Sequence, residues 1–450
     1  MSGERTAVSG EREVGERKGG ARWVSPRLLL TVCVSLVTLL LPAPLHAQGP
    51  IWFHLSAQAI PSYTHASAIP NGGGLGEVRI VQPILMIDAG ALAGHLRFRS
   101  TLDAEGWTIP DGQLAPGDWG EGFDDRRHPH TYVHELILTS IGHSGPLGFS
   151  LSVGKGFVPF GTDDPMSRPA LIYPVNHHLS QILERGVAAL GLSAGPVVLE
   201  GSLFDGDEPE RPGQWPLLGT SSSGIYSGWR FGDSWSARLT VRPGAGLEFQ
   251  GSRARVRSPE HRPGAGTDNF KWSVSGRLAR EIAGAPGYAL IEWARSTEAS
   301  GFFVFHSFLL EGAWSPGRHR PYYRFERTDR PEDMRTLDPF RSVRPHLENS
   351  ILGTTRWTVH TIGYGLLLSP SRARWEIQPF AEASYSKPEN LSGGIFDPAT
   401  FYRSDHIWTL SAGLRLSWLM SGHRMGRYGV AADEGGSMGM GMVMPPSHGH

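Results

Sequence analysis

The stretch that decides the fold is IWTLSAGLRLSWL, residues 407–419. Its even-numbered positions from Trp408 to Trp418 are all apolar, whereas its odd-numbered positions from Thr409 to Ser417 are polar or small. A period of two places successive side chains on opposite faces of a β-strand. The stretch therefore predicts a strand with one apolar and one polar face, and aromatic residues close both ends of the apolar face. This pattern is typical of a tilted strand that crosses a membrane.

The same alternation recurs along the chain, for example in HLRFRSTL (95–102), WSARLTVRP (235–243) and FKWSVSGRL (270–278). We predict 16 strands near residues 51–60, 76–88, 91–103, 131–142, 146–155, 184–193, 196–205, 234–242, 246–257, 270–281, 287–296, 302–314, 320–328, 354–367, 373–385 and 406–419. Seven short turns alternate with eight mostly longer links between these strands. Residues 224–231 also alternate, but a seventeenth strand would break this order, so we assign them to a loop.

The link lengths favour a membrane barrel over a soluble β-sandwich, in which strands also alternate. Short turns on one side and long links on the other are typical of outer-membrane barrels with both chain ends in the periplasm. In lipid, only a closed barrel pairs every backbone group of its strands. We therefore predict an all-β, transmembrane, antiparallel up-and-down barrel of about 16 strands over residues 48–420. A barrel of this size leaves an aqueous channel between its polar inner faces.

The first 47 residues predict a secretory signal peptide. Arg22 and Arg27 precede the apolar run LLLTVCVSLVTLLL (28–41), which is too short to span a bilayer. We expect cleavage after Ala47 and export to the bacterial outer membrane; an uncleaved anchor is the alternative. Cys33, the single cysteine, lies within this run. The rest of the chain can therefore form neither a disulfide nor a cysteine metal site.

The charge balance argues against a nucleic-acid-binding protein. Residues 48–450 keep 36 Lys and Arg against 39 Asp and Glu, a formal net charge of −3. Nucleic-acid-binding domains usually carry a clear basic excess. After residue 47 no apolar stretch approaches the roughly 20 residues that a transmembrane helix needs.

Charged residues on the polar faces of the predicted strands are the candidates for the channel lining. The basic candidates are Arg97, Arg99, Arg238, Arg242, Arg253, Arg255, Lys271, Arg277, Arg324, Arg356 and Arg415. The acidic candidates are Glu200, Glu248, Glu292, Glu311, Glu326, Glu376 and Glu382. One interpretation is a water-filled pore with an arginine bias, densest on the eighth to tenth strands, which would favour anions. The other is that these charges pair across neighbouring strands and only solvate the interior.

The third long link contains DDPMSRPALIYPVNHH, residues 163–178, in which two acids and two histidines resemble half of a metalloenzyme site. Prolines in this link exclude a strand. Adjacent histidines on a strand-like segment point in opposite directions, so they cannot easily ligate one metal ion. The metalloprotease motif H-E-x-x-H is also absent from the sequence. A catalytic or metal site is therefore the weakest of the interpretations.

The chain resembles bacterial outer-membrane porin-like proteins over most of residues 48–420. The resemblance is carried by SVGKGFVPFGTDDPMSRP (152–169), NHHLSQILERG (176–186), DSWSARLTVRP (233–243) and SRARVRSPEH (252–261). It implies that the third long loop folds into the barrel and narrows it, with a constriction at Asp163, Asp164, Arg168, His177 and His178. It also implies a homotrimer. The alternative is a loop that covers the barrel mouth, with its charges solvated or bound to lipopolysaccharide cations.

Residues 421–450 predict a flexible periplasmic tail rich in Met, His and Gly. The candidate metal ligands in it are Met438, Met440, Met442, Met444, His448 and His450. Thioethers suit Cu(I), and imidazoles suit copper and zinc. A low-complexity end of accidental composition is the competing interpretation.

Together these patterns predict a porin-like channel for passive diffusion of small hydrophilic solutes, with a preference for anions as the sharper hypothesis. The expected surroundings are outer-membrane lipid and lipopolysaccharide. We expect no enzymatic reaction and no cofactor beyond copper at the tail. The alternatives are a barrel that handles copper through its tail, a structural barrel plugged by its loops, and a lipid-modifying outer-membrane barrel.

Overall fold

The computed structural model describes the barrel and the segments that enter it, all within one compact unit, Gln48–His450. The described residues are 51–68, 73–108, 131–162, 164–175, 177–206, 213, 215, 231–257, 268–333, 351–369, 374–392, 397–420 and 424–432. The predicted signal peptide, the predicted loop at 224–230 and the Met/His ligands at 438–450 lie outside these residues. Their assignments stay predictions.

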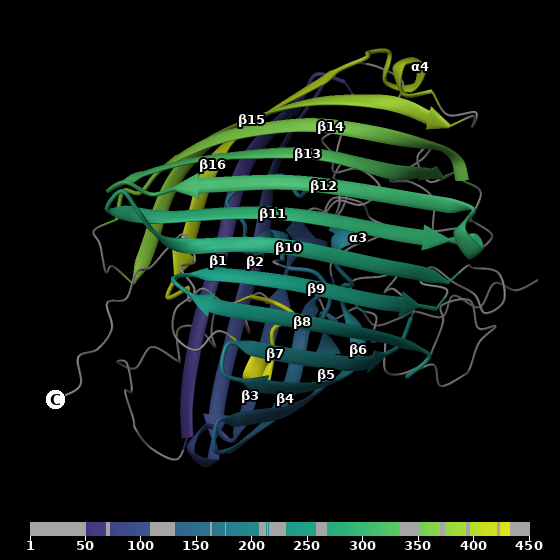
Figure 1. The fold of residues 1–450 in the computed structure, drawn as a ribbon. Coiled ribbons are helices and arrows are strands. Elements are labelled where there is room, and N and C mark those ends of the chain that lie inside the picture. Colours follow the sequence, from purple (N-terminus) through teal and green to yellow (C-terminus); the bar gives the residue numbers. More distant parts are fainter. Residues whose placement is uncertain are drawn as a thin grey trace, which may run out of the picture. The chain divides into compact units, whose positions relative to one another are not determined.

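Sixteen antiparallel strands form one closed barrel, in which each strand pairs with its sequence neighbours and β1 pairs with β16 (Figure 1). The strands are β1 (Ile51–Ala66), β2 (Leu75–Ala91), β3 (Leu96–Asp103), β4 (Val133–Ser144), β5 (Leu147–Gly156), β6 (Arg185–Ala194), β7 (Val197–Phe204), β8 (Ser234–Gly244), β9 (Leu247–Val256), β10 (Asn269–Ile282), β11 (Ala285–Glu298), β12 (Phe303–Trp314), β13 (His319–Asp333), β14 (Ile351–Leu366), β15 (Trp375–Ser392) and β16 (Ile407–Trp418). The predicted fold class and strand number are confirmed.

Short turns and long links alternate around the barrel as predicted. The link between β10 and β11, for example, is Ala283-Gly284, and both residues have positive φ, +50° and +76°. A two-residue turn of this conformation matches the twist of the strands it joins. The short turns define one end of the barrel, called here the short-turn end, which faces the periplasm in outer-membrane barrels. The opposite, long-link end faces the cell exterior.

The burial pattern of the strands is inverted relative to a soluble protein. On β16, Thr409 and Ser411 are buried, whereas Trp408 and Leu410 are 48% and 53% exposed. The same alternation runs through β5, β7 and β8, with apolar side chains outside. Only a lipid environment makes such an outer face favourable, because it would otherwise expose a continuous apolar surface to water.

Two aromatic pairs mark the limits of the apolar band on β15 and β16. Trp375 lies against Trp418 with ring centroids 6.1 Å apart, and Tyr385 lies against Trp408 at 4.8 Å. Ten residues separate the pairs along the strand, which corresponds to roughly 33 Å. At a strand tilt of about 40° this spans about 25 Å, the height of the apolar band of outer-membrane barrels. The pairs therefore lie where the two membrane interfaces are expected.

The helical elements of the described residues are short. They are α2 (Glu105–Thr108), α3 (His177–Ser180), α4 (Pro398–Tyr402), and the 3₁₀ turns η1 (Leu92–Gly94), η2 (Pro165–Ser167), η4 (Ala299–Gly301) and η6 (Gly429–Ala431). None of the helices in the described part of the chain has the length and apolar character needed to cross a membrane.

The lipid-facing assignment predicts the effect of an outward charge. Leu239 lies at the centre of β8 and is 46% exposed on the outer face. Leu239→Arg is expected to lower the free energy of unfolding in a lipid bilayer by about 2–4 kcal/mol, because the guanidinium would be placed in hydrocarbon. Denaturant unfolding in vesicles measures this, with Leu239→Ala as the control for lost apolar area. Equal stability of the Arg and Ala variants would place this face away from lipid.

Candidate functional site

The link between β5 and β6, residues 157–184, lies inside the barrel and crosses it. The backbone N–H of Gly161 donates to Ser252 Oγ of β9 at 3.1 Å, and that of Leu171 donates to Glu382 of β15 at 2.8 Å. All described side chains of this link except Ser167 and Leu183 are buried. The third long link therefore occupies the lumen, as the family resemblance implied, and does not cover the mouth.

Glu382 of β15 binds the middle of the link by hydrogen bonds. Its carboxylate accepts the backbone N–H groups of Leu171 and Ile172, at 2.8 and 3.1 Å, and the hydroxyl of Tyr322 at 2.9 Å. Arg415 of β16 donates to the Pro169 carbonyl at 3.3 Å. A carboxylate that accepts two backbone N–H bonds satisfies donors that a proline-rich loop cannot pair within itself.

Arg324 of β13 holds the next part of the link. Its guanidinium is fully buried and donates to Glu311 at 2.7 Å and to the Ile172 carbonyl at 2.6 Å. Glu326, on the same strand, accepts the backbone N–H of Val175 at 2.8 Å and lies 3.8 Å from Arg324. The wall charges are therefore used in pairs to bind the backbone of the link.

The constriction candidates of the link divide into two groups. Asp164, Arg168 and His177 are buried in the lumen. Arg168 lies 3.7 Å from Glu292 of β11. Asp163 and the side chain of His178 lie outside the described part of the structure. Asp164, Arg168 and His177 therefore point into packed protein.

Asp164 closes a tight turn within the link. Its carboxylate accepts the backbone N–H of Met166 at 2.6 Å. Burial raises the pKa of this carboxyl to about 7, because the hydrogen bond and the charges of His134 and Arg168 offset only part of the lost hydration. Burial therefore makes the Asp164 carboxyl harder to ionise than a solvated aspartate.

An apolar cluster joins the link to one side of the wall inside the barrel. It combines wall residues of β1, β2 and β15 with residues of the link and one residue beyond β16: Ile60, Val81, Ile84, Met86, Phe380, Phe157, Met166, Leu171, Tyr173 and Met425. The inserted segments therefore narrow the lumen on the side of β1, β2 and β15. The barrel is too wide to be filled by wall side chains alone, and the inserted segments supply the missing volume.

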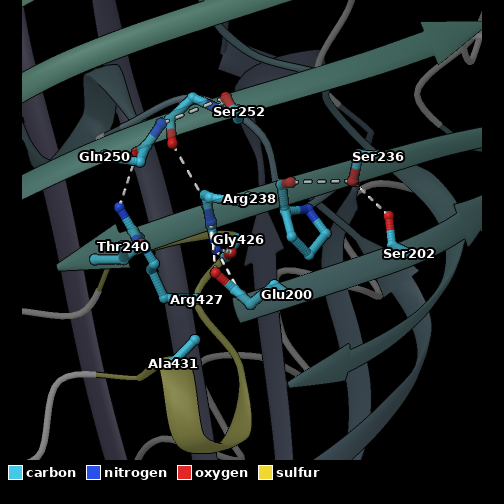
Figure 2. Close-up of polar contacts among 12 residues, drawn as sticks. Glu200, Ser202, Ser236, Arg238, Thr240, Gln250, Ser252, Gly426, Arg427 and Ala431 are labelled. Carbon is cyan, nitrogen blue, oxygen red and sulfur yellow. Dashed lines mark hydrogen bonds and ion pairs between the residues drawn. The ribbon is translucent and has the colours of Figure 1, made fainter. Parts of the chain in front are cut away.

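The chain after β16 corrects a prediction. Residues 421–450 were expected to form a flexible tail, but residues 424–432 lie inside the barrel, where most of their side chains are buried. Figure 2 shows this segment beside the wall residues of β7, β8 and β9, with the Gly426 backbone next to Arg238 and the Arg427 side chain next to Gln250. Arg238 donates to the Gly426 carbonyl at 2.6 Å, and Arg427 donates to Gln250 at 3.1 Å.

Most predicted lining residues do face the lumen. The inward-facing set is Arg97, Arg99, Arg238, Arg242, Lys271, Arg277, Arg324, Arg415, Glu200, Glu248, Glu292, Glu311, Glu326, Glu376 and Glu382. The proposed basic wall on β8–β10 is largely neutralised, since Arg238 pairs with Glu200 at 2.6 Å and Arg242 with Glu248 at 3.0 Å. Here the structure favours the interpretation of paired charges.

Three predicted lining residues, Arg253, Arg255 and Arg356, stand on the outer face instead. Arg253 stacks on Trp272 at 4.5 Å from the ring centroid, and its strand neighbours Ser252 and Ala254 are the buried ones. Arg255 pairs with Asp268 at 2.6 Å. Pairing with aromatic rings or acids lowers the cost of a charge on this face.

Arg356 failed as a lining residue for a different reason. It pairs with Asp329 at 2.7 Å, and its neighbour Trp357 is the fully buried, inward-facing residue. Trp357 packs against Tyr402, with ring centroids 5.9 Å apart. Trp357 is an aromatic residue on the inner face of β14. A rule that puts polar residues inside and apolar residues outside therefore assigns the wrong set of alternate positions on β14 to the lumen.

Sequence reasoning missed a buried ionic cluster near the start of β4. His134 lies 3.2 Å from Glu184 and 3.7 Å from Asp103, and Lys155 lies 3.3 Å from Glu184. These residues come from four separate elements, so no local spacing could have joined them. Among the described residues, no group of three or more His, Asp or Glu side chains is arranged to hold a metal ion.

Comparisons with known proteins give similarity at the level of architecture. No protein-family model and no curated protein matches the chain. Among solved structures, an anion-selective porin from Comamonas acidovorans is 10% identical, with a TM-score of 0.48, and covers 82% of this chain and 100% of its own. The trimer form of OmpT, an outer-membrane protein of Vibrio cholerae, is 12% identical with a TM-score of 0.46 and the same coverage. OpdO from Pseudomonas aeruginosa is 11% identical with a TM-score of 0.37, covering 81% of this chain and 96% of its own.

At such identities and scores these comparisons carry no argument about function. The geometry of the chain itself supplies one, through the closed barrel of 16 strands, the apolar outer band and the third long link folded into a charged lumen. The chain therefore has the architecture of a transmembrane β-barrel of 16 strands with an inserted third long link.

Proposed function

We propose that the barrel is a passive diffusion channel for small hydrophilic solutes, with a preference for anions. The observation that carries the proposal is the closed 16-strand wall, apolar outside and charged inside. A charged inner face suits a lumen that water and hydrophilic solutes enter, and part of its charge also binds the inserted segments. The link 157–184 and the segment 424–432 narrow the lumen, which limits passage to small solutes.

The anion preference rests on the charges that remain partly exposed toward the short-turn end. There, Arg97, Arg99, Arg277 and Arg415 are partly exposed on the inner face, against the acids Asp88, Glu281 and Glu376, whereas Arg242 is paired with Glu248. The excess is positive even though Arg99 pairs with Asp88 at 2.8 Å. This partly exposed inner surface at the short-turn end is called here the vestibule. Its positive excess concentrates anions.

Single-channel recording of the purified, refolded protein in a planar bilayer with a salt gradient tests the proposal. Stable conductance steps with a reversal potential on the anion side support it. A correctly inserted barrel that never conducts would overturn it and favour a structural barrel plugged by its loops.

The corrected inner and outer faces predict opposite effects for two pairs of arginines. Arg99→Gln with Arg277→Gln is expected to shift the reversal potential toward cations, because both side chains face the vestibule. The matched control, Arg253→Gln with Arg356→Gln, removes the same charge from the outer face and is expected to leave the reversal potential unchanged. Equal shifts for both pairs would contradict the assignment of the faces.

We also propose outer-membrane lipid and lipopolysaccharide as the partners of the apolar band, and a homotrimer as the assembly. Native mass spectrometry of the detergent-extracted protein measures the assembly directly. A monomer as the sole species would contradict the trimer while leaving the channel proposal intact.

A further inference from the structure

The segment after β16, Arg424–Ala432 (RMGRYGVAA), is called here the plug segment. It does not continue the barrel; it turns back into the lumen and is bound there by both side chains and backbone. Its two arginines converge on one wall residue, Glu248 of β9. Arg424 reaches both carboxylate oxygens at 2.9 and 2.8 Å, and Arg427 reaches one at 3.0 Å. Glu248 is buried, so this is a desolvated, charge-assisted contact.

Tyr428 fixes the plug segment to the inserted link. Its hydroxyl donates to Glu135 of β4 at 3.0 Å and accepts the backbone N–H of Phe157 at 2.9 Å. Met425 packs in the same apolar cluster as Phe157 and Leu171. The plug segment and the link 157–184 therefore pack against each other in the lumen.

The wall opposite the plug segment is shaped to receive it. A Cβ atom on Gly148 or on Gly191 would lie 3.0 Å from the side chain of Val430. A Cβ on Gly156 would lie 2.5 Å from the Tyr428 hydroxyl. Small wall residues at these positions leave the lumen with space along β5 and β6, and the plug segment occupies that space.

Gly429 is the position where the plug segment comes closest to the wall. Its φ is +53°, in the left-handed region, and a Cβ there would lie 2.2 Å from Ser150 Oγ. The backbone of Val430 donates to the same hydroxyl at 3.1 Å. Only glycine combines this backbone conformation with this approach.

The plug segment also ends beside the vestibule. Arg242, one of the partly exposed arginines, donates to the Ala431 carbonyl at 2.8 Å, and Arg99 donates to the Arg427 carbonyl at 3.1 Å. Two of the vestibule arginines are thus used as hydrogen-bond donors to the segment. It lies across the route from the short-turn end to the space along β4–β9.

From these contacts we propose that the plug segment is a built-in plug that closes the solute path in the short-turn half of the lumen beside β4–β9, below the apolar contacts of the inserted link with that wall. Release of the plug segment opens the path. It also makes the lining of the path more negative, because Arg424 and Arg427 leave while Glu248 and Glu135 stay. The closed state therefore conducts poorly with a bias to anions, and the open state conducts well with a weaker bias. This inference rests on the proposed channel function.

Two truncations of the full chain test the plug. Deletion of residues 421–450 removes the plug segment, whereas deletion of residues 433–450 is the matched control that keeps it. The first is expected to raise the single-channel conductance several-fold and to shift the reversal potential toward cations, and the second is expected to change neither. Heat-modifiable migration in gel electrophoresis confirms that each barrel is folded.

A single substitution tests the same point with the chain length unchanged. Gly429→Val places a branched side chain where Ser150 leaves no room, so the plug segment cannot dock, and the conductance is expected to rise as in the longer deletion. If both deletions conduct like the full chain, the plug is refuted while the channel function stands. If none of the folded variants conducts, the channel function itself fails. An equal rise in single-channel conductance in both deletion variants would show that residues 433–450 restrict the conductance, and it would overturn the proposal.

Discussion

Replacing Glu382 by alanine is expected to lower the free energy of unfolding by about 3–5 kcal/mol, because it removes a buried carboxylate on which several donors depend. The backbone N–H groups of Leu171 and Ile172 lose their acceptor, and so does the Tyr322 hydroxyl. A buried donor left unpaired costs about 1–3 kcal/mol. The link is then expected to detach from β15, so the conductance should rise together with the loss of stability.

Denaturant unfolding in lipid vesicles and single-channel recording measure the two effects of Glu382→Ala. Glu382→Gln is the graded control, since its amide oxygen still accepts one of the two backbone N–H groups, and its loss should be smaller. Lys387→Ala, at an exposed position on the same strand, is expected to stay within about 0.5 kcal/mol of the parent. A Glu382→Ala barrel as stable as the parent would show that the link is held by its apolar contacts alone.

Arg324→Met is expected to cost a comparable amount, about 3–5 kcal/mol, because it leaves buried charges without their partner. Glu311 and Glu326 would face each other across β12 and β13 without the guanidinium between them, and the Ile172 carbonyl would lose its donor. The methionine fills much of the same volume, so the loss reports on charge and hydrogen bonding more than on packing.

A double-mutant cycle separates these contributions. Arg324→Met combined with Glu311→Gln is expected to recover part of the lost stability, since neutralising Glu311 removes one of the unpaired charges. Arg327→Met, at an exposed outward position of the same strand, is the matched control and is expected to have little effect. Strict additivity of the two inner substitutions would contradict a direct interaction between Arg324 and Glu311.

The misassignment of Arg253 and Arg255 has its cause in the phase of one strand, β9. On β9 the acid Glu248 and the bases Arg253 and Arg255 were all assigned inward, although their positions differ by odd numbers of residues. A period of two allows only one parity to face the lumen, and burial selects Glu248. Arg253 was assigned to the lumen because it is charged. The sequence does not show that Trp235 and Trp272, on the neighbouring strands, stack on it at the outer face.

The wall of the barrel follows from the pattern of residues along the chain. Alternation with a period of two, as in residues 407–419, specifies a strand between lipid and a polar interior, and the alternating link lengths specify an up-and-down order. Both signals are local, because each strand pairs with its neighbour in the chain. The strand number and the closed barrel were therefore predictable from the sequence alone.

Only the tertiary structure decided what fills the barrel. The link 157–184 and the plug segment lack a periodic pattern, and their partners are distant in sequence: Leu171 binds Glu382, and Arg427 binds Glu248. Such contacts depend on the width of the closed lumen and on the small side chains of β5 and β6, which exist as a surface only once the wall has formed. The wall follows from the local pattern of the strands, whereas the closure of the channel follows from the long-range contacts inside it.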